Sequence, residues 1–215
     1  IRFRMQNRVT YIKNEDENGG YDAQIRRLRL RFDGYVGSPK FLYAVQLSFA
    51  PGDVGEIKDG ENINIIRDAV FMYRPNKRWN LSFGQTKLPG NRQRVNSSGG
   101  LQLTDRTINN GKFTIDRDFG FQLHNMNEFK DKFSYNFKGA VSTGEGRNST
   151  EKPDDGIAVT GKIEILPLGA FTKDGTYFEG DIMREKKPKL MFSGAFQQNN
   201  HARRTQGQLG NDLFE

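Results

Sequence analysis

Apolar and polar side chains alternate with a period of two along most of this chain. In the opening segment Ile1, Phe3 and Met5 hold odd positions, while Arg2 and Arg4 lie between them. Successive side chains of a β-strand point to opposite faces, so each such segment has one apolar and one polar face. The pattern predicts an all-β protein with nine strands and no helix. The predicted strands cover residues 1–11, 27–36, 41–49, 65–74, 79–84, 119–124, 133–142, 159–165 and 190–196.

Long and short connections alternate between these segments, which is typical of transmembrane β-barrels with short turns at one end and long loops at the other. The predicted long connections are residues 12–22, 51–63, 86–117 and 144–156, and the short ones are residues 37–40, 75–78 and 127–132. The eighth connection, residues 167–188, breaks the alternation because it is long where a short turn is due.

Composition excludes several classes of protein. The longest uninterrupted apolar runs have five residues, whereas a transmembrane helix needs about 20. A membrane-spanning barrel remains open, because its alternating strands average out as polar. The chain has 17 Phe and no Cys, so it is too rich in rings for a disordered chain and has neither disulfides nor thiolate metal sites.

Two folds fit alternating strands: a soluble antiparallel sandwich with its apolar faces inside, and a barrel with its apolar faces toward lipid. Several segments reach about 9–11 residues, which is the length of a tilted strand across a bilayer. Aromatic residues near segment ends, Tyr11, Phe41, Trp79 and Phe133, are typical of the interfacial belts of a barrel. We therefore predict an antiparallel transmembrane β-barrel of the porin type.

The polar faces of the first two segments are cationic. These segments are hairpin neighbours, so their arginines are expected to form two adjacent columns along the wall of a water-filled pore. Such columns attract anions, and guanidinium groups bind phosphate or carboxylate oxygens with two hydrogen bonds. The alternative is a set of solvated charges balanced by Asp and Glu. The predicted pore-lining and anion-binding residues are Arg2, Arg4, Arg8, Arg27, Arg29 and Arg31.

Residues 86–117 form a connection of unusual length, and loops of that length are commonly functional or disordered. In a barrel this loop could fold inward and narrow the pore, and the alternative is an exposed loop with scattered charge. Its cationic residues, Lys87, Arg92, Arg94, Arg106 and Lys112, are the predicted constriction-loop residues.

Several longer blocks resemble the phosphate-selective porin O and P family in its Bacteroidetes-type branch. They are residues 84–94 (GQTKLPGNRQR), 101–106 (LQLTDR), 116–120 (DRDFG), 177–181 (YFEGD) and 202–210 (ARRTQGQLG), together with the Arg-rich second strand. The resemblance implies a trimeric porin of about 16 strands in the outer membrane of a Gram-negative bacterium. It also implies contact with lipid and lipopolysaccharide, a third loop folded into the channel, and passage of small anions such as phosphate along an arginine ladder.

Nine strands cannot close a barrel of that size. We therefore expect residues 1–215 to be the N-terminal part of one barrel domain whose chain ends before closure.

No motif predicts catalysis, a cofactor or a metal site. The two histidines, His124 and His201, stand apart in the sequence, and His124 holds a polar strand position. The sequence thus predicts a diffusion channel that is not an enzyme and has no nucleic-acid partner. Two alternatives stay open: a soluble β-rich module that binds polyanions, suggested by the net charge of +7, and a barrel subunit of a larger transport or export complex.

Overall fold

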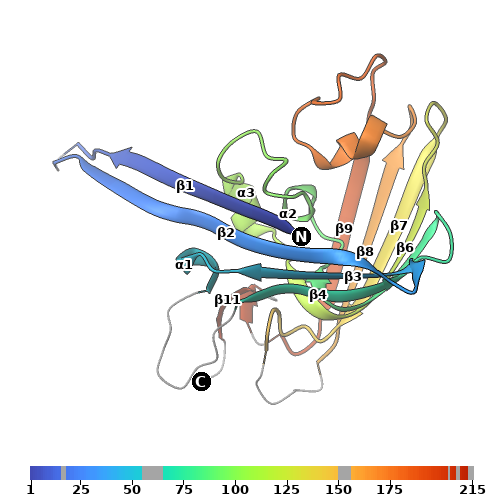
Figure 1. Ribbon diagram of the computed structural model, residues 1–215, viewed down its shortest axis with the longest axis horizontal. Coiled ribbons are helices and arrows are strands. Elements are labelled where there is room, and N and C mark those ends of the chain that lie inside the picture. The colour runs from blue at the N-terminus through green and yellow to red at the C-terminus, as the bar shows by residue number, and fades with distance from the viewer. Residues whose placement is uncertain (16–17, 55–64, 150–155, 203, 207–208, 213–215) are drawn as a thin grey trace.

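The computed structural model describes residues 1–15, 18–54, 65–149, 156–202, 204–206 and 209–212. Nine antiparallel strands form one sheet in which every strand pairs with its neighbours in the sequence (Figure 1). The strands are β1 (Arg2–Ile12), β2 (Gly20–Val36), β3 (Ser38–Ser48), β4 (Ile66–Tyr73), β5 (Trp79–Lys87), β6 (Arg117–Asn127), β7 (Ser134–Ser142), β8 (Ala158–Leu166) and β9 (Phe192–Asn199). The predicted all-β class and all nine strands are confirmed.

The other elements are small. A separate two-stranded sheet, which the sequence pattern did not predict, pairs β10 (Arg204–Gln206) with β11 (Leu209–Asp212). The expectation of no helix is wrong only for four- to six-residue turns inside connections. These are α1 (Pro51–Val54), α2 (Arg92–Val95), α3 (Ile108–Lys112) and the 3₁₀ turn η1 (Thr172–Tyr177). Within the described residues, no helix has both the length and the apolar character needed to span a membrane.

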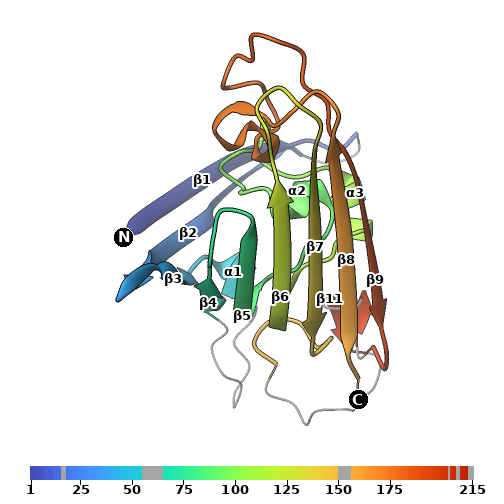
Figure 2. The ribbon, with the colours of Figure 1, turned by 90° about the vertical axis from the view of Figure 1, so that its right-hand side faces the viewer.

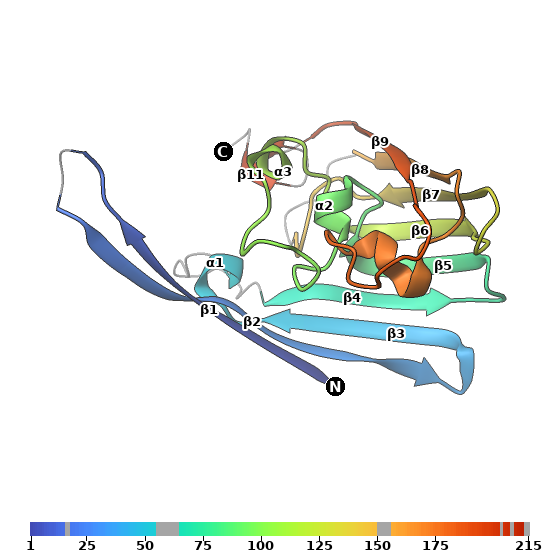
Figure 3. The ribbon, with the colours of Figure 1, turned by 90° about the horizontal axis from the view of Figure 1, so that it is seen from above.

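The sheet curves strongly, and the connection between β5 and β6 lies inside the curve with α2 and α3 (Figures 1 and 3). We call this connection, residues 88–116, the inner loop. Among the described residues, β1 and β9 are the two edges of the sheet and do not pair with each other, so the sheet is open. The β1–β2 hairpin extends beyond the other strands (Figure 1).

Burial is inverted relative to a water-soluble sheet protein. Gln122 is only 5% exposed on the concave face, whereas its neighbour Phe121 is 64% exposed on the convex face. On β7, Ser142 is 4% exposed and Val141 is 51% exposed. A large continuous apolar surface of this kind is expected only where lipid or another protein covers it. The structure therefore fits the barrel prediction better than the sandwich, which would enclose its aromatic rings.

Aromatic side chains gather on the convex face at the end of the sheet that carries the short turns. Phe41 and Tyr73 face each other across β3 and β4 with ring centroids 4.9 Å apart. Trp79 begins β5. At the start of β7, the ring centroids of Tyr135 and Phe133 lie 6.2 Å apart. This row has the position of the aromatic belt that barrels place at a membrane surface.

Connection lengths follow the predicted alternation for the first seven links. One difference is that β2 begins at Gly20, so the first link is shorter than the predicted 12–22, and β2 has 17 residues. The predicted connections 51–63 and 144–156 lie partly outside the described residues. The eighth link is long, as the sequence indicated, and starts at the short-turn end of the sheet (Figure 2).

Candidate functional site

The two predicted arginine columns stand side by side on the concave face. In the β1–β2 pairing, Arg2 is opposite Arg31 and Arg4 is opposite Arg29, while Arg27 is opposite Gln6. Like charges directly opposite each other destabilise a strand pair, so this arrangement needs other groups to offset the repulsion. Those groups come from the inner loop, from α1 and from Asp33 of β2.

Asp105 of the inner loop offsets three arginines at the long-loop end. Its carboxylate lies 3.1 Å from Arg8, 2.8 Å from Arg26 and 3.2 Å from Arg27. Arg26 and Arg27 are consecutive, yet both reach the same side because the strand register shifts between Gln6 and Asn7. A β-bulge of this kind sets two residues against one and redirects a side chain.

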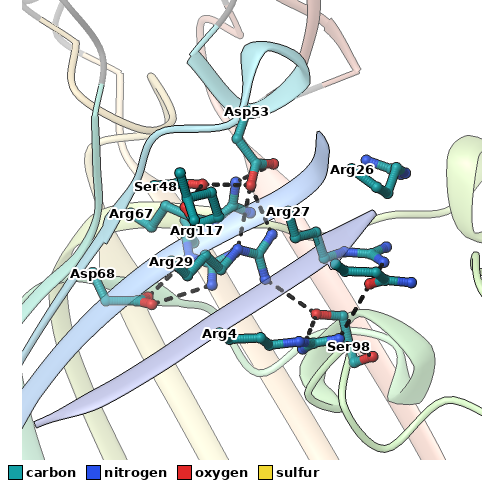
Figure 4. Close-up of polar contacts among 12 residues, drawn as sticks. Arg4, Arg26, Arg27, Arg29, Ser48, Asp53, Arg67, Asp68, Ser98 and Arg117 are labelled. Atoms are coloured by element: carbon teal, nitrogen blue, oxygen red, sulfur yellow. Dashed lines mark hydrogen bonds and ion pairs between the residues drawn. The ribbon is translucent and has the colours of Figure 1, made fainter. Parts of the chain in front are cut away.

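Ser98 of the inner loop joins the two columns further along the wall (Figure 4). Arg4 donates hydrogen bonds to its hydroxyl at 2.7 Å and to its carbonyl at 2.8 Å, and Arg29 donates to the same hydroxyl at 3.1 Å. The inner loop is therefore fastened to the wall by the arginines of the predicted ladder. Arg2 and Arg31 lie apart from these contacts and share Asp33.

Two further carboxylates are each shared by two arginines. Asp53 of α1 lies 2.9 Å from Arg29 and 2.6 Å from Arg67, and it also accepts a hydrogen bond from Ser48 (Figure 4). Asp116, at the end of the inner loop, contacts Arg94 and Arg117. Arg117 also lies 2.9 Å from Asp68.

Burial alone would raise the pKa of Asp53 and of Asp116, but the nearby guanidinium groups hold each pKa well below its usual range. For Asp53 these groups are Arg67 and Arg29, and for Asp116 they are Arg94 and Arg117. Both carboxylates therefore stay ionised down to strongly acidic pH.

Two cations of the predicted constriction loop contact backbone carbonyls. The Lys87 amine lies 2.9 Å from the Val95 carbonyl and 3.0 Å from the Asn96 carbonyl. Arg106 donates to the carbonyls of Gln93 at 2.6 Å and Asn96 at 3.0 Å. Among the described residues, no ion pair involves Lys87 or Arg106. Burial and neighbouring arginines, Arg94 first, lower the pKa of Arg106 to about 10, so it remains charged at neutral pH.

These groups surround a cavity of about 260 Å³ between the wall and the inner loop. Its lining includes the Ser97, Ser98 and Thr86 side chains, together with seven cationic residues and the single carboxylate of Asp68. The cationic residues are Arg29, Arg31, Arg67, Lys87, Arg94, Arg106 and Arg117. Cations and hydroxyl donors around one point are the groups that bind an oxyanion.

The remaining predicted constriction residues have different surroundings. The guanidinium group of Arg92 contacts backbone carbonyls of the β8–β9 connection, and Lys112 is exposed on α3. The structure thus brings Lys87, Arg94 and Arg106 to the cavity and leaves Arg92 and Lys112 away from it.

The opposite wall carries a more compact charge cluster. Lys138 and Lys162 lie 2.8 and 3.0 Å from the carboxylate of Glu164, and Asn136 donates to the same group at 3.2 Å. Lys138 also contacts the Tyr177 hydroxyl at 3.2 Å. These lysines face a larger cavity of about 1040 Å³ at the short-turn end.

The sequence pattern missed several functional candidates. Arg26 was missed because apolar residues change from odd positions, ending at Ile25, to even positions, beginning at Leu28, and this shift is the signal of the bulge. Asp53 and Arg67 were missed because they are separated along the chain and meet only through the pairing of β3 with β4.

Within the described part of the chain, no group of His, Cys, Asp and Glu side chains could hold a metal ion. No curated protein and no solved structure matches the chain. The family model of phosphate-selective porin O and P matches residues 1–170 of the 215. The chain therefore belongs to the phosphate-selective porin O and P family of outer-membrane porins.

Proposed function

We propose that this outer-membrane porin favours anions and that the cavity beneath the inner loop binds phosphate or a similar oxyanion during passage. Membership of the porin family implies that the protein forms a water-filled channel rather than an enzyme. The preference for anions rests on one observation: seven cationic side chains and one carboxylate line the same cavity. The inner loop, which lies within predicted residues 86–117, is proposed as the constriction of this channel.

The charge balance supports a positive potential in the cavity. Asp33, Asp53, Asp68 and Asp116 contact five of the seven cationic residues, while Lys87 and Arg106 contact carbonyls. A carbonyl satisfies a hydrogen-bond donor without cancelling its charge. A positive excess in a confined space concentrates anions, and the low local dielectric constant strengthens the effect.

The same contacts keep binding weak enough for transport. A conducting site must attract an ion and then release it, so tight binding would stop the flow. Here the guanidinium groups are already partly occupied by carboxylates and by Ser98. An entering oxyanion exchanges water for a few available donors and is not enclosed by a complete set.

We further propose, on the family resemblance, that the channel is a homotrimer in contact with lipid and lipopolysaccharide. The exposed convex face supports the lipid contact, because apolar side chains such as Phe83 and Phe121 cover it. A soluble polyanion-binding module is not favoured, because that face would lie in water.

Reversal potentials across planar bilayers test the proposal on the full-length protein. In a potassium chloride gradient we expect an anion-selective potential, and added inorganic phosphate should reduce the chloride current. Arg31→Gln removes one charge from the cavity and should lower both the selectivity and the sensitivity to phosphate. Lys132→Gln removes the same charge from an exposed turn and should change neither. A cation-selective wild-type channel would overturn the proposal.

A further inference from the structure

The long connection between β8 and β9 meets the inner loop inside the curve of the sheet. We call residues 167–191 the crossing segment. It leaves the sheet where β8 ends, at the short-turn end, whereas the inner loop leaves the opposite end after β5. The orange crossing segment and the green inner loop approach each other in Figures 2 and 3. This explains the broken alternation of connection lengths: a short turn could not reach the inner loop.

Arg92 makes the main side-chain contact between the two segments. Its guanidinium group donates to the Thr176 carbonyl at 3.2 Å and to the Phe178 carbonyl at 2.6 Å. Two donors of one planar group thus bind two carbonyls of the crossing segment. A lysine amine could not reproduce this forked geometry.

The backbones of the two segments also contact each other. The Glu179 amide donates to the Gly100 carbonyl at 2.8 Å, and the Gln102 amide donates to the Glu179 carboxylate at 3.1 Å. A Cβ on Gly100 would lie 2.8 Å from the Tyr177 carbonyl, so this close approach requires glycine. The backbones of the inner loop and the crossing segment are therefore in direct contact at Gly100.

The crossing segment is itself fastened to the wall of the sheet. Ala170 donates to the Phe129 carbonyl at 2.8 Å, and Tyr177 lies against Lys138 of β7 at 3.2 Å. Lys189 contacts the Lys130 carbonyl of the β6–β7 turn, and its second carbonyl contact, to Leu168, lies within the crossing segment. The segment is therefore a fixed support on which the inner loop can rest.

We propose that the crossing segment holds the inner loop in its position in the channel and that Arg92 is the positioning residue of this contact. The proposal rests on the proposed function, because it assigns a mechanical role within that channel. Arg92 then contributes to a steady pore through its two carbonyl contacts and is not an anion ligand. A loop fastened only by its two ends and by one wall would move into and out of the ion path.

Single-channel recordings on the full-length protein separate a positioning role from a charge effect. Arg92→Gln and Arg92→Lys should both increase the time that the channel spends away from its main conductance level, by about tenfold or more, because both lose the forked hydrogen bonds. The anion-to-cation permeability ratio should stay at the wild-type value in Arg92→Lys. Lys186→Gln, an equal loss of charge at an exposed site of the crossing segment, should leave the recordings unchanged.

A disulfide provides the rescue experiment, since residues 1–215 contain no cysteine. A Cβ on Gly180 would lie 3.7 Å from the Gln102 Cγ, so the two positions are direct neighbours across the contact. In the Arg92→Gln background, the pair Gln102→Cys and Gly180→Cys should restore steady conductance when oxidised and lose it when reduced. Mass spectrometry confirms the cross-link.

The outcomes distinguish this proposal from the proposed function. Steady recordings from Arg92→Lys together with unsteady ones from Arg92→Gln would show that charge matters and would overturn the positioning role. Failure of the cross-link to form or to restore steady conductance would also overturn it. Absence of anion selectivity in the wild-type channel would overturn the proposed function alone.

Discussion

On each of the two walls of the curved sheet one carboxylate is shared by two cations, but the surroundings of the two carboxylates differ. On the arginine wall, formed by β1–β4, Asp53 lies between Arg29 and Arg67, and these two arginines line a cavity together with other cations. On the lysine wall, Lys138 and Lys162 converge on Glu164, and all three side chains are nearly buried. Forked guanidinium groups reach several partners at once, whereas ammonium groups act as point charges.

This difference teaches that a carboxylate shared by two cations does not by itself locate the site. The arginine wall contacts the inner loop through extended side chains and leaves a cationic cavity beneath it. The lysine wall satisfies its charges locally and supports Tyr177 of the crossing segment. We therefore expect charge changes on the arginine wall to alter ion selectivity, and charge changes on the lysine wall to alter stability first.

The largest expected effect tests the lysine wall. Glu164→Gln leaves Lys138 and Lys162 buried without their carboxylate, so the free energy of unfolding should fall by about 3–5 kcal/mol. Asp33→Asn removes the carboxylate that Arg2 and Arg31 share near the surface. Its free energy of unfolding should fall by only about 0–1 kcal/mol. Urea titrations in detergent measure both values. Equal losses in the two variants would remove the distinction between buried and exposed pairs.

Acid should weaken the attachment of the inner loop through Asp116, which contacts Arg94 and Arg117. Its pKa is held below the usual range in the folded protein, so its contribution to stability is present above about pH 4 and is lost as the pH falls below that value. Each such carboxylate contributes up to about 1.4 kcal/mol per pH unit in that window. Unfolding titrations between pH 6 and pH 3 should show a shallower acid loss in Asp116→Asn than in the wild type. Identical slopes would contradict the assignment.

The smallest expected effect compares Lys87, which lines the cationic cavity, with Lys162 of the lysine wall. Lys87→Gln should weaken the block of chloride current by phosphate by about tenfold, because a unit charge about 12 Å away is worth ~1.4 kcal/mol at an effective dielectric constant of 20. Lys162→Gln should change the block much less, since Glu164 already offsets that charge. Phosphate titrations of the current measure both. A larger effect in Lys162→Gln would place the anion site on the lysine wall.

The sequence was sufficient for the strands and for their two faces. Period-two alternation identified all nine strands, and hairpin adjacency placed the two arginine columns side by side, with Arg2 opposite Arg31 and Arg4 opposite Arg29. These features are local, because the direction of a side chain follows from its place in a strand. The predicted roles of these arginines in anion passage stay predictions.

The cavity and the crossing segment could not be predicted in the same way. Ser98, Asp53 and Asp105 come from connections without periodicity, and their partners are distant in the sequence. The sequence indicated the crossing segment only as a long connection at a place where a short turn was expected. Its contact with Gly100 depends on how two irregular backbones fold inside the sheet.

The central claim is that the arginine face lines the aqueous pathway and that the opposite face does not. Two neighbouring residues of β2 test it most directly, because residues 1–215 contain no cysteine: Arg31→Cys on the concave face and Leu30→Cys on the convex face. A charged, membrane-impermeant thiol reagent added during current recording should change the current of Arg31→Cys within minutes and leave that of Leu30→Cys unchanged. The reverse result, or an equal response of both variants, would contradict the account.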